Sequence, residues 1–599
     1  MKKQILSLAF VSLSIFLSAQ ESENIEEVHI QGKFLNLPYK KVNENITLIT
    51  KSEIQNSPSQ SIDEILQQYA GMDIRRRGSN GVQSDVSVRG GSFEQVLIFL
   101  NGIRMNDSQT GHNSLNIPVD LSNVERIEIV KGPSARRFGN GAYAAINIIT
   151  KTFSEENVKI SAEGGDYQTY NLGLSSNFGN EKFSGLFSVN SGASEGYRHN
   201  TDYKINNIFY QNQFKLTNGK IQFQAGFSEK KFGANGFYAS PLATEQYEET
   251  QASVVSVMHS QAFGKFNLNS NIFWRRGQDM YLYNREKPEI YRNMHIGNNV
   301  GGEINGSYTS NLGTTGLGVE LRKEFLVSNN LGDRERFITQ LFFEHHFSFI
   351  DNKLQVSPGI SWANFSNSGD FFYPGIDVGY DFNNQHKIYG NVAKVHRVPT
   401  FTDLYYVSRT EQGNANLNPE SAVSYELGYR FLKKGLTAKA SLFGRNSEDE
   451  IDWVKNSAEE KWAAQNIGKV ETKGFETEIN QNFEGFLKSY SIGYTFTENK
   501  LKTESAFTRY ALDQLKHQFI AKIENRFLKN FTNELSYRYQ ERATGYSYNL
   551  LDEKLSFHQN NLELFVLINN LTNTNYTETF GVPMPKRWFH VGFSYQLGL

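Results

Sequence analysis

The last eleven residues of the chain, Phe589 to Leu599, alternate without a break. Successive side chains of a β-strand point to opposite faces of the sheet, so this pattern gives one apolar face and one small or polar face. About ten such residues form a tilted strand long enough to cross a bilayer, with lipid on one side and a polar lumen on the other. Similar segments recur from about residue 154 onward, and the sequence therefore predicts a transmembrane β-barrel. The apolar positions of this last segment are Phe589, Val591, Phe593, Tyr595, Leu597 and Leu599.

Net charge, the N-terminal segment and the absence of catalytic motifs narrow the class of protein. They indicate an exported protein, and they give no support for a nucleic-acid partner or an enzymatic site. The formal net charge of −2 gives no electrostatic reason to bind nucleic acid. The one long apolar run, Ile5 to Leu17, follows Lys2 and Lys3, which is the pattern of a signal peptide spanning residues 1–20. The absence of cysteine excludes disulfides and thiolate metal sites. No nucleophile elbow or clustered His/Glu motif indicates catalysis.

Ten short turns rich in Gly, Asn and Lys divide residues 154–599 into hairpins. Taken as periplasmic turns, they separate eleven hairpins and predict 22 antiparallel strands of ten to twelve residues, with long external loops such as 232–250 and 277–298. A barrel of this width needs a plug in its lumen. The turns fall near Gly179-Asn180, Asn218-Gly219, Gly264-Lys265, Leu312-Gly313, Asp351-Asn352, Asn383-Asn384, Lys434-Gly435, Glu484-Gly485, Lys529-Asn530 and Gln559-Asn560.

Residues 33–153 have a different, mixed α+β pattern. A short apolar strand at 46–50 precedes a helix that we expect to begin with a capping box of Ser61 and Glu64 and to stop at Gly71. Asn101-Gly102 between two apolar segments is a strong hairpin signal. The pattern alone fits an ordinary periplasmic domain as well as a plug.

Several motifs taken together resemble the TonB-dependent outer-membrane receptors over essentially the whole chain after residue 20. The resemblance implies a monomeric active importer in the outer membrane of a Gram-negative bacterium. It would be surrounded by lipid, would consist of an N-terminal plug inside a 22-stranded barrel, and would draw its energy from the periplasmic protein TonB. The motifs are DVSVRG at 85–90, VLIFLNGIRM at 96–105, VERIEIVKGP at 124–133, INIITK at 146–151, HRVPTFTDLY at 396–405, GNANLNPE at 413–420, KGFETE at 473–478 and INNLTNTNY at 568–576.

Contact with TonB requires an extended peptide that can add as a strand to the edge of a TonB sheet. The segment after the signal peptide, residues 21–32, resembles such a TonB box and its linker. The residues expected to pair are Glu26, Glu27, Val28, His29 and Ile30. The alternative reading is that this segment is the first strand of the plug.

The resemblance also maps four charged residues to a plug–barrel lock. The plug residues Arg89 and Lys131 are expected to face the barrel residues Glu426 and Glu476. Lys131 stands where the family has arginine, and a lysine lacks the bidentate fork of a guanidinium. The alternative is that these charges are part of general solvation of the lumen.

The ligand is expected to meet two plug loops, 76–80 and 106–112, together with external loops. The plug and the chain length are most similar to the cobalamin receptors of the family, so a corrinoid is the first expectation and a ferric siderophore the second. No resident cofactor is expected, and the sequence gives no support for structural Ca²⁺. A passive porin would not explain the plug, whereas an additional role as an adhesin or phage receptor stays open. The expected ligand-binding residues are Arg76, Asn80, Asn106, Asp107 and His112.

Overall fold

The computed structural model describes residues 29–31, 36–141, 143–151, 156–238, 240–502, 507–579 and 581–598. The expected signal peptide and residues 26–28 of the expected TonB box lie outside these ranges. None of the described helices is both long and apolar enough to cross a membrane.

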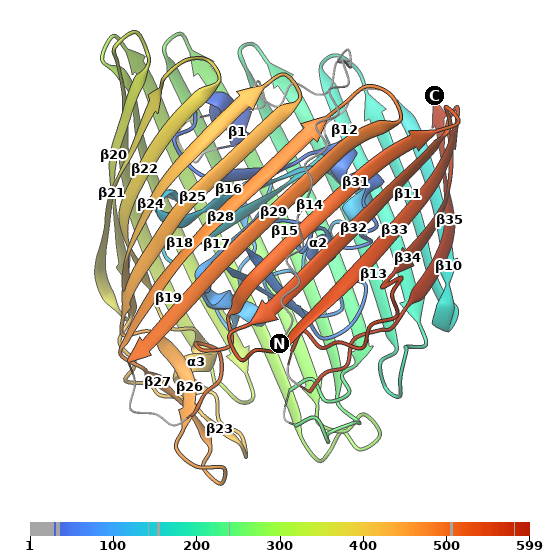
Figure 1. The fold of residues 1–599 in the computed structure, drawn as a ribbon. Helices are drawn as coiled ribbons and strands as arrows, with labels where there is room; N and C mark the ends of the chain where they lie inside the picture. Colours follow the sequence, from blue (N-terminus) through green and yellow to red (C-terminus); the bar gives the residue numbers. More distant parts are fainter. Residues whose placement is uncertain are drawn as a thin grey trace, which may run out of the picture.

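A closed barrel of 22 antiparallel strands forms the wall of the molecule (Figure 1). Each strand pairs with its neighbours along the chain, and β10 pairs with β35 to close the ring. The sequence-based prediction of 22 strands is thereby confirmed. The strands are β10 Asn157–Gly165, β11 Thr169–Gly179, β12 Phe183–Ser194, β13 Tyr203–Leu216, β14 Gly219–Gly233, β15 Tyr247–Phe263, β16 Phe266–Leu282, β17 Arg292–Ser310, β18 Gly313–Ser328, β19 Arg334–Phe349, β20 Leu354–Phe365, β21 Gly369–Asp381, β22 His386–Arg397, β24 Glu420–Lys433, β25 Leu436–Glu448, β28 Lys469–Asn482, β29 Leu487–Lys502, β31 Leu515–Phe527, β32 Phe531–Arg542, β33 Ser547–Gln559, β34 Leu562–Asn569 and β35 Trp588–Gly598.

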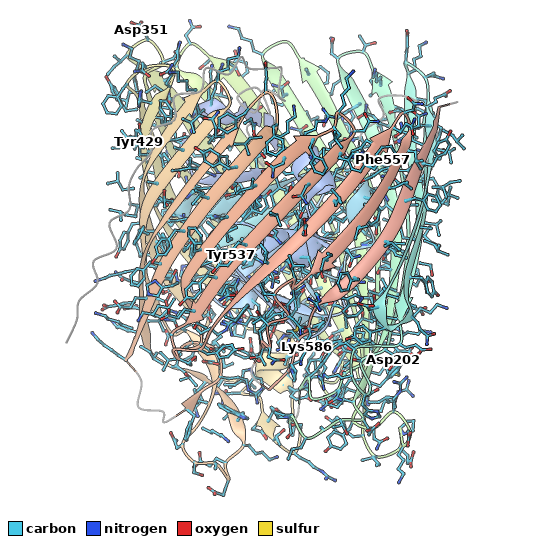
Figure 2. All side chains as sticks on the ribbon, turned by 45° about the vertical axis from the view of Figure 1, so that its right-hand side comes forward. Asp202, Asp351, Tyr429, Tyr537, Phe557 and Lys586 are labelled. Carbon is cyan, nitrogen blue, oxygen red and sulfur yellow. The ribbon has the colours of Figure 1, made fainter. Side chains whose placement is uncertain are left out.

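Side chains alternate across this wall as the sequence predicts. On β35 the outward residues Val591 and Leu597 are 59% and 43% exposed, whereas His590 on the inner face is 2% exposed. Apolar side chains on the outer face match the hydrocarbon of a bilayer, and polar ones face the lumen. Tyr429 and Phe557 are among the aromatic side chains on this outer wall (Figure 2).

All ten predicted turns join consecutive barrel strands at one rim. This rim is at the top in Figure 1, and the long loops are at the bottom. Figure 2 shows Asp351, in one of the turns, at the end opposite to Asp202 and Lys586, which lie in two of the long loops. Short turns face the periplasm in barrels of this kind, so the lower rim is the external one.

The strands are longer, and two of the loops shorter, than the sequence suggested. Barrel strands reach 19 residues in β17 rather than ten to twelve. The loops expected at 232–250 and 277–298 shrink to 234–246 and 283–291, because β14, β15, β16 and β17 continue into them. The strands continue to pair beyond the bilayer. Residues in these extensions no longer alternate between apolar and polar, so the sequence pattern that marks a strand is absent there.

The plug lies inside the lumen and is built on a five-stranded sheet with the order β3-β8-β9-β6-β7 (Figure 1). β6 runs parallel to β9, while the other pairs are antiparallel. A second sheet pairs β4 with β5. The elements of the plug are β3 Ile46–Ile49, α1 Lys51–Asn56, α2 Ile62–Leu66, β4 Met72–Arg76, β5 Ser84–Val88, β6 Val96–Leu100, β7 Ile103–Arg104, β8 Val124–Lys131 and β9 Ala144–Thr150, with 3₁₀ helices η2 Tyr39–Lys41, η3 Phe93–Gln95, η4 Gly111–Asn113, η5 Leu121–Asn123 and η6 Gly132–Phe138.

Two local predictions for the plug have different outcomes. Asn101 and Gly102 both adopt positive φ, as the predicted β6–β7 hairpin turn requires. The predicted capping box of Ser61 and Glu64 is wrong, because the Ser61 side chain makes no cap hydrogen bond. The Glu64 carboxylate instead accepts from the backbone N–H of Gln60. A capping box does form one helix earlier, between Thr50 and Glu53.

Three external loops combine into a small sheet that stands outside the barrel. Its order is β23-β27-β26-β30, and it contains strands from the β22–β24, β25–β28 and β29–β31 loops. The same side carries α3, near the bottom of Figure 1. The remaining elements are β1 His29–Gln31, β2 Asn36–Pro38, η7 Asp166–Gln168, α3 Phe401–Tyr405, β23 Glu411–Gln412, β26 Ile451–Lys455, β27 Trp462–Asn466 and β30 Phe507–Thr508.

Candidate functional site

The two plug loops expected to meet the ligand, 76–80 and 106–112, lie at the external end of the plug; we call them the apex loops. Arg76, at the end of β4, is buried in an ion-pair network with the β34–β35 loop. Its guanidinium contacts the Glu578 carboxylate at 2.9 Å and the Glu64 carboxylate at 3.0 Å, and it donates to the Tyr576 hydroxyl at 3.3 Å. These contacts fix the first apex loop against the barrel wall.

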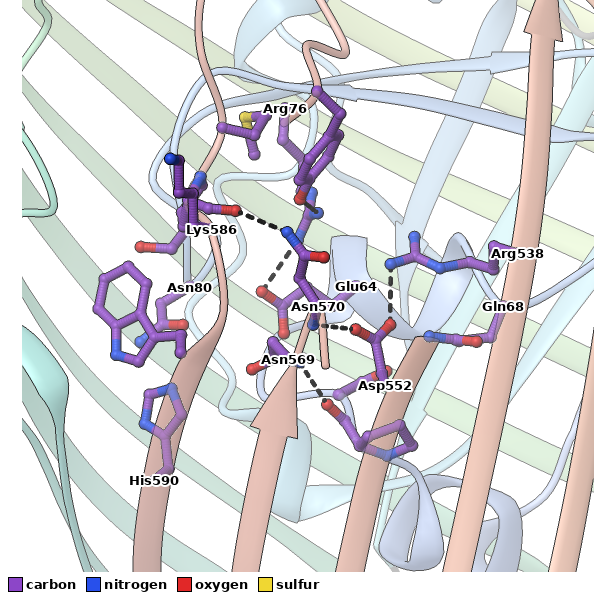
Figure 3. Close-up of a pocket in the computed structure, with 17 residues that line it drawn as sticks. Glu64, Gln68, Arg76, Asn80, Arg538, Asp552, Asn569, Asn570, Lys586 and His590 are labelled. Atoms are coloured by element: carbon purple, nitrogen blue, oxygen red, sulfur yellow. Dashed lines mark hydrogen bonds and ion pairs between the residues drawn. The ribbon is translucent and has the colours of Figure 1, made fainter. Parts of the chain in front are cut away.

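A cavity opens beside Arg76 and Asn80, between the plug and β33–β35 (Figure 3); its empty space, about 480 Å³, includes open solvent at its mouth. Asn80 has positive φ, and its amide donates to the Tyr203 hydroxyl of the wall. The indole N–H of Trp588 is buried without a hydrogen-bond partner in the described structure. Amide groups and the exposed ammonium of Lys586 also line this cavity, which we call the apex cavity. Its free groups suit a ligand rich in hydrogen-bond acceptors.

The second apex loop lines another cavity, on the opposite side of the plug. Asp107 binds Arg275 of β16 at 2.6 Å and accepts from the Gln109 N–H at 3.0 Å. The Asn106 amide bonds the plug backbone at Ile98 and Val96, so it holds the loop's shape. Both residues contribute to the wall of a second cavity, which we call the lateral cavity; its empty space, about 510 Å³, includes open solvent at its mouth.

His112 lies apart from both cavities, in an aromatic cluster between the plug and an external loop. Its Nδ1 is 2.6 Å from the Asp85 carboxylate, and its ring stacks on Phe93 with 4.3 Å between centroids. Tyr510, of the β29–β31 loop, packs edge-on against both rings. Burial opposes the charged form of Asp85, but Arg77 and His112 outweigh it and lower its pKa. His112 therefore links the plug to the external loops.

The structure brings the four residues of the predicted lock together across the plug–barrel boundary. The Arg89 guanidinium forms a bidentate pair with Glu426 at 3.0 and 3.3 Å and reaches Glu476 at 3.3 Å. Lys131, 0% exposed, contacts Glu476 at 2.6 Å. Burial lowers the pKa of Lys131, while Glu476 favours its charged form. The lysine thus makes a single-point contact where a guanidinium would have offered two.

The expected TonB box is only partly described. His29 and Ile30 lie in β1, which pairs antiparallel with β2 near the turn rim, and Ile30 is buried. Glu26, Glu27 and Val28 lie outside the described residues. The role of this segment stays a prediction.

Sequence reasoning missed most partners of the expected site residues. Glu578 follows the INNLTNTNY motif by two residues, and this proximity was the one available signal. A second plug–barrel cluster was also missed. Arg136 and Arg137, three and four residues after the VERIEIVKGP motif, contact Asp377 of β21 at 2.8 and 3.0 Å. Among the described residues, no group of three or more His, Cys, Asp or Glu side chains could hold a metal ion.

Comparison with known proteins agrees with this architecture. Residues 38–146 match the TonB-dependent receptor plug domain, and residues 152–582 match the TonB-dependent receptor-like β-barrel. The chain is 23% identical to the vitamin B12 transporter BtuB of Vibrio vulnificus over 100% of both chains. It is also 23% identical to BtuB of Vibrio cholerae over 100% of both.

Solved structures share the fold at lower identity. A mutant ferric enterobactin receptor, PfeA of Pseudomonas aeruginosa, superposes with a TM-score of 0.76 at 16% identity, over 93% of this chain and 100% of the other. The FrpB iron transporter of Neisseria meningitidis gives a TM-score of 0.77 at 15% identity, over 92% and 99%. The plug, the closed barrel and the match to both domains together show that the chain belongs to the TonB-dependent receptor family, the active transporters of the Gram-negative outer membrane.

Proposed function

We propose that this TonB-dependent transporter captures a corrinoid at the cell surface and imports it into the periplasm. The observation that carries the proposal is the end-to-end similarity to transporters named for vitamin B12, at 23% identity with both chains fully covered. The solved siderophore receptors resemble the chain at 15–17% identity, which supports the fold alone.

The chemistry of the apex cavity supports a ligand with many amide groups. The periphery of a corrinoid carries primary amides, whose oxygens accept and whose N–H groups donate. The apex cavity offers the side-chain oxygens of Asn80 and Asn569, the free Trp588 N–H and the Lys586 ammonium, whereas the Asn570 amide is already bonded within the β34–β35 loop. A cavity wall with both hydrogen-bond donors and acceptors suits amides better than purely anionic groups, which only accept.

Import requires the plug to be held without ligand and moved with energy from TonB. Ion pairs between the plug and the wall hold it, because each charge would be costly to leave buried alone. The expected TonB-binding residues, Glu26 to Ile30, precede the plug, so tension on them would be transmitted to β1, β2 and the lock.

A ferric siderophore is the second candidate. It is favoured by the cationic groups of the lateral cavity, which includes Arg104 and Arg336. Catecholate and carboxylate oxygens are good acceptors for guanidinium groups.

Titration of the purified protein with cyanocobalamin and with several ferric siderophores tests the choice. We expect nanomolar binding of the corrinoid, about −12 kcal/mol. Asn80→Gly suits the positive φ at this position and removes the amide, so it should weaken corrinoid binding about tenfold, as expected for the loss of one hydrogen bond. Asn560→Gly, at the exposed β33–β34 turn and also with positive φ, is the matched control. Absent or micromolar corrinoid binding with tight binding of one ferric siderophore would overturn the proposal.

A further inference from the structure

The lateral cavity contains an arginine without an acidic partner. Arg104, in β7 of the plug, lines this cavity and is half-buried. Its Nη2 donates to the Asn140 carbonyl at 3.1 Å. Within the described residues, no carboxylate lies within ion-pair distance of its guanidinium, so the remaining N–H groups are available to another acceptor.

The charged groups nearest to Arg104 are already paired with one another. Arg322 pairs with Glu320 at 2.9 Å and with Glu324 at 3.2 Å, and Arg336 shares Glu324 at 2.9 Å. These two guanidinium groups and two carboxylates pair with one another, and neither carboxylate lies within ion-pair distance of Arg104. Burial, followed by the nearby Arg322, lowers the pKa of Arg104 to about 10. At neutral pH the group is still charged and would be stabilised by an anion.

Other unpaired polar groups of this cavity are also donors. Ser108, 5% exposed, has a buried hydroxyl without a partner in the described structure. The Nε–H of Arg397 is likewise buried and unpaired, although its two Nη atoms bind Asp403 and Glu420. Burial, together with the nearby Asp403, raises the pKa of Glu94 to about 8, so this carboxyl is mostly neutral at pH 7.

We infer that the lateral cavity is a subsite for an anionic oxygen group of the imported solute, held by Arg104 and Ser108. In the part of the chain that the structure describes, the Arg104 guanidinium has only a carbonyl partner and the buried Ser108 hydroxyl has none, and a phosphate or carboxylate oxygen would accept from both. Asn106 and Asp107 of the second apex loop form part of the same wall, so the subsite adjoins the region where the solute is expected. The inference rests on the proposed function for the identity of the solute. In a cobalamin, the phosphodiester would be the anionic group.

Two pairs of probes distinguish the source of the anion. Cyanocobalamin carries a phosphodiester, whereas dicyanocobinamide is a corrinoid without one. A ferric tricatecholate is anionic, whereas a ferric trihydroxamate can be neutral. Each is titrated against the full-length wild-type protein and against Arg104→Met, which keeps an apolar stem in place. Arg409→Met, at an exposed position of the β22–β24 loop, is the matched control.

We expect Arg104→Met to weaken cyanocobalamin binding about 10- to 100-fold, the scale of a lost charge-assisted hydrogen bond. Binding of dicyanocobinamide should change by less than about threefold, the scale of an ordinary surface substitution. Ser108→Ala should act in the same direction with a smaller effect, and this second variant removes no charge.

The outcomes separate the two proposals. Equal loss, or no loss, for cyanocobalamin, which has the phosphodiester, and dicyanocobinamide, which lacks it, would overturn the anion subsite while the corrinoid assignment stands. If neither corrinoid binds, the corrinoid assignment fails. The ferric pair then tests the subsite, because Arg104→Met should weaken binding of the anionic tricatecholate but not of the neutral trihydroxamate. Binding of no probe overturns both.

Discussion

The strongest test of the plug–barrel lock is the removal of Glu476. Its carboxylate contacts the Lys131 ammonium at 2.6 Å and the Arg89 guanidinium at 3.3 Å. In Glu476→Ala, Arg89 keeps its bidentate pair with Glu426, but Lys131 keeps only the Ala70 carbonyl. Removing one partner of a buried pair costs about 3–5 kcal/mol, because the other charge stays buried. The plug should therefore open about 100- to 4,000-fold more often.

Thiol labelling measures this opening, because the chain contains no native cysteine. Ser87, on β5, is 4% exposed, so Ser87→Cys provides a buried probe within the plug. When reclosing is faster than labelling, the labelling rate follows the open population. Tryptophan fluorescence would report on the wall and loops instead, because the five tryptophans lie at positions 274, 362, 453, 462 and 588.

Two variants control the experiment. Glu448→Ala removes the partner of Lys469 from an ion pair on the same wall, but both side chains are mainly exposed, so labelling should hardly change. Lys131→Met combined with Glu476→Ala leaves no lysine charge unpaired and should recover most of the lost stability. A labelling rate in Glu476→Ala equal to that of Glu448→Ala would refute the lock.

Three further perturbations follow from the same structure. Proline at Val28 removes an N–H that pairing with TonB needs, so uptake by cells should stop while ligand binding to the purified protein persists; normal uptake would sink the TonB-box assignment. Glu94 has a pKa of about 8 in the folded plug against 4.5 when unfolded, so its contribution to stability is complete below pH 4.5 and is lost as the pH rises toward 8. In Glu94→Gln, the unfolding temperature measured by calorimetry at pH 5, 6.5 and 8 should fall less steeply with pH than in the wild type. An unchanged dependence of the unfolding temperature on pH would contradict the assignment. Glu578→Ala leaves Glu64 as the only carboxylate partner of Arg76 among the described residues, so hydrogen exchange of the β4 amides should accelerate relative to the β9 amides; equal exchange with the wild type would show that the pair does not hold the apex loop.

The features predictable from the sequence were those set by neighbouring residues. Alternation marked the strands, and Gly/Asn pairs marked the turns, because pleat and positive φ depend on local chemistry. The Ser61 capping box failed because such a motif permits a cap without requiring one, and the Glu64 side chain bonds Arg76 and the Gln60 N–H instead.

The partners across the lumen were beyond local reasoning. Arg76 and Glu578 are 502 residues apart, and only the curvature and register of the closed wall bring them together. The ends of the strands were missed for a related reason. Past the bilayer, hydrogen bonding continues while the lipid no longer selects apolar side chains, so the sequence signal stops before the strand does.

The closing pair of the barrel constrains the order of assembly. Asn157 pairs with Gly598 and Gly165 with His590, so the ring cannot close until the end of the chain is in place. The plug precedes β10 in the chain and is bonded to strands around the wall, including β16, β21, β24, β28 and β32. Contacts between such distant segments form slowly, because a long loop must close first. A chain halted before β35 would therefore present two unpaired strand edges, on β10 and β34, and a plug bonded to a wall that is still open.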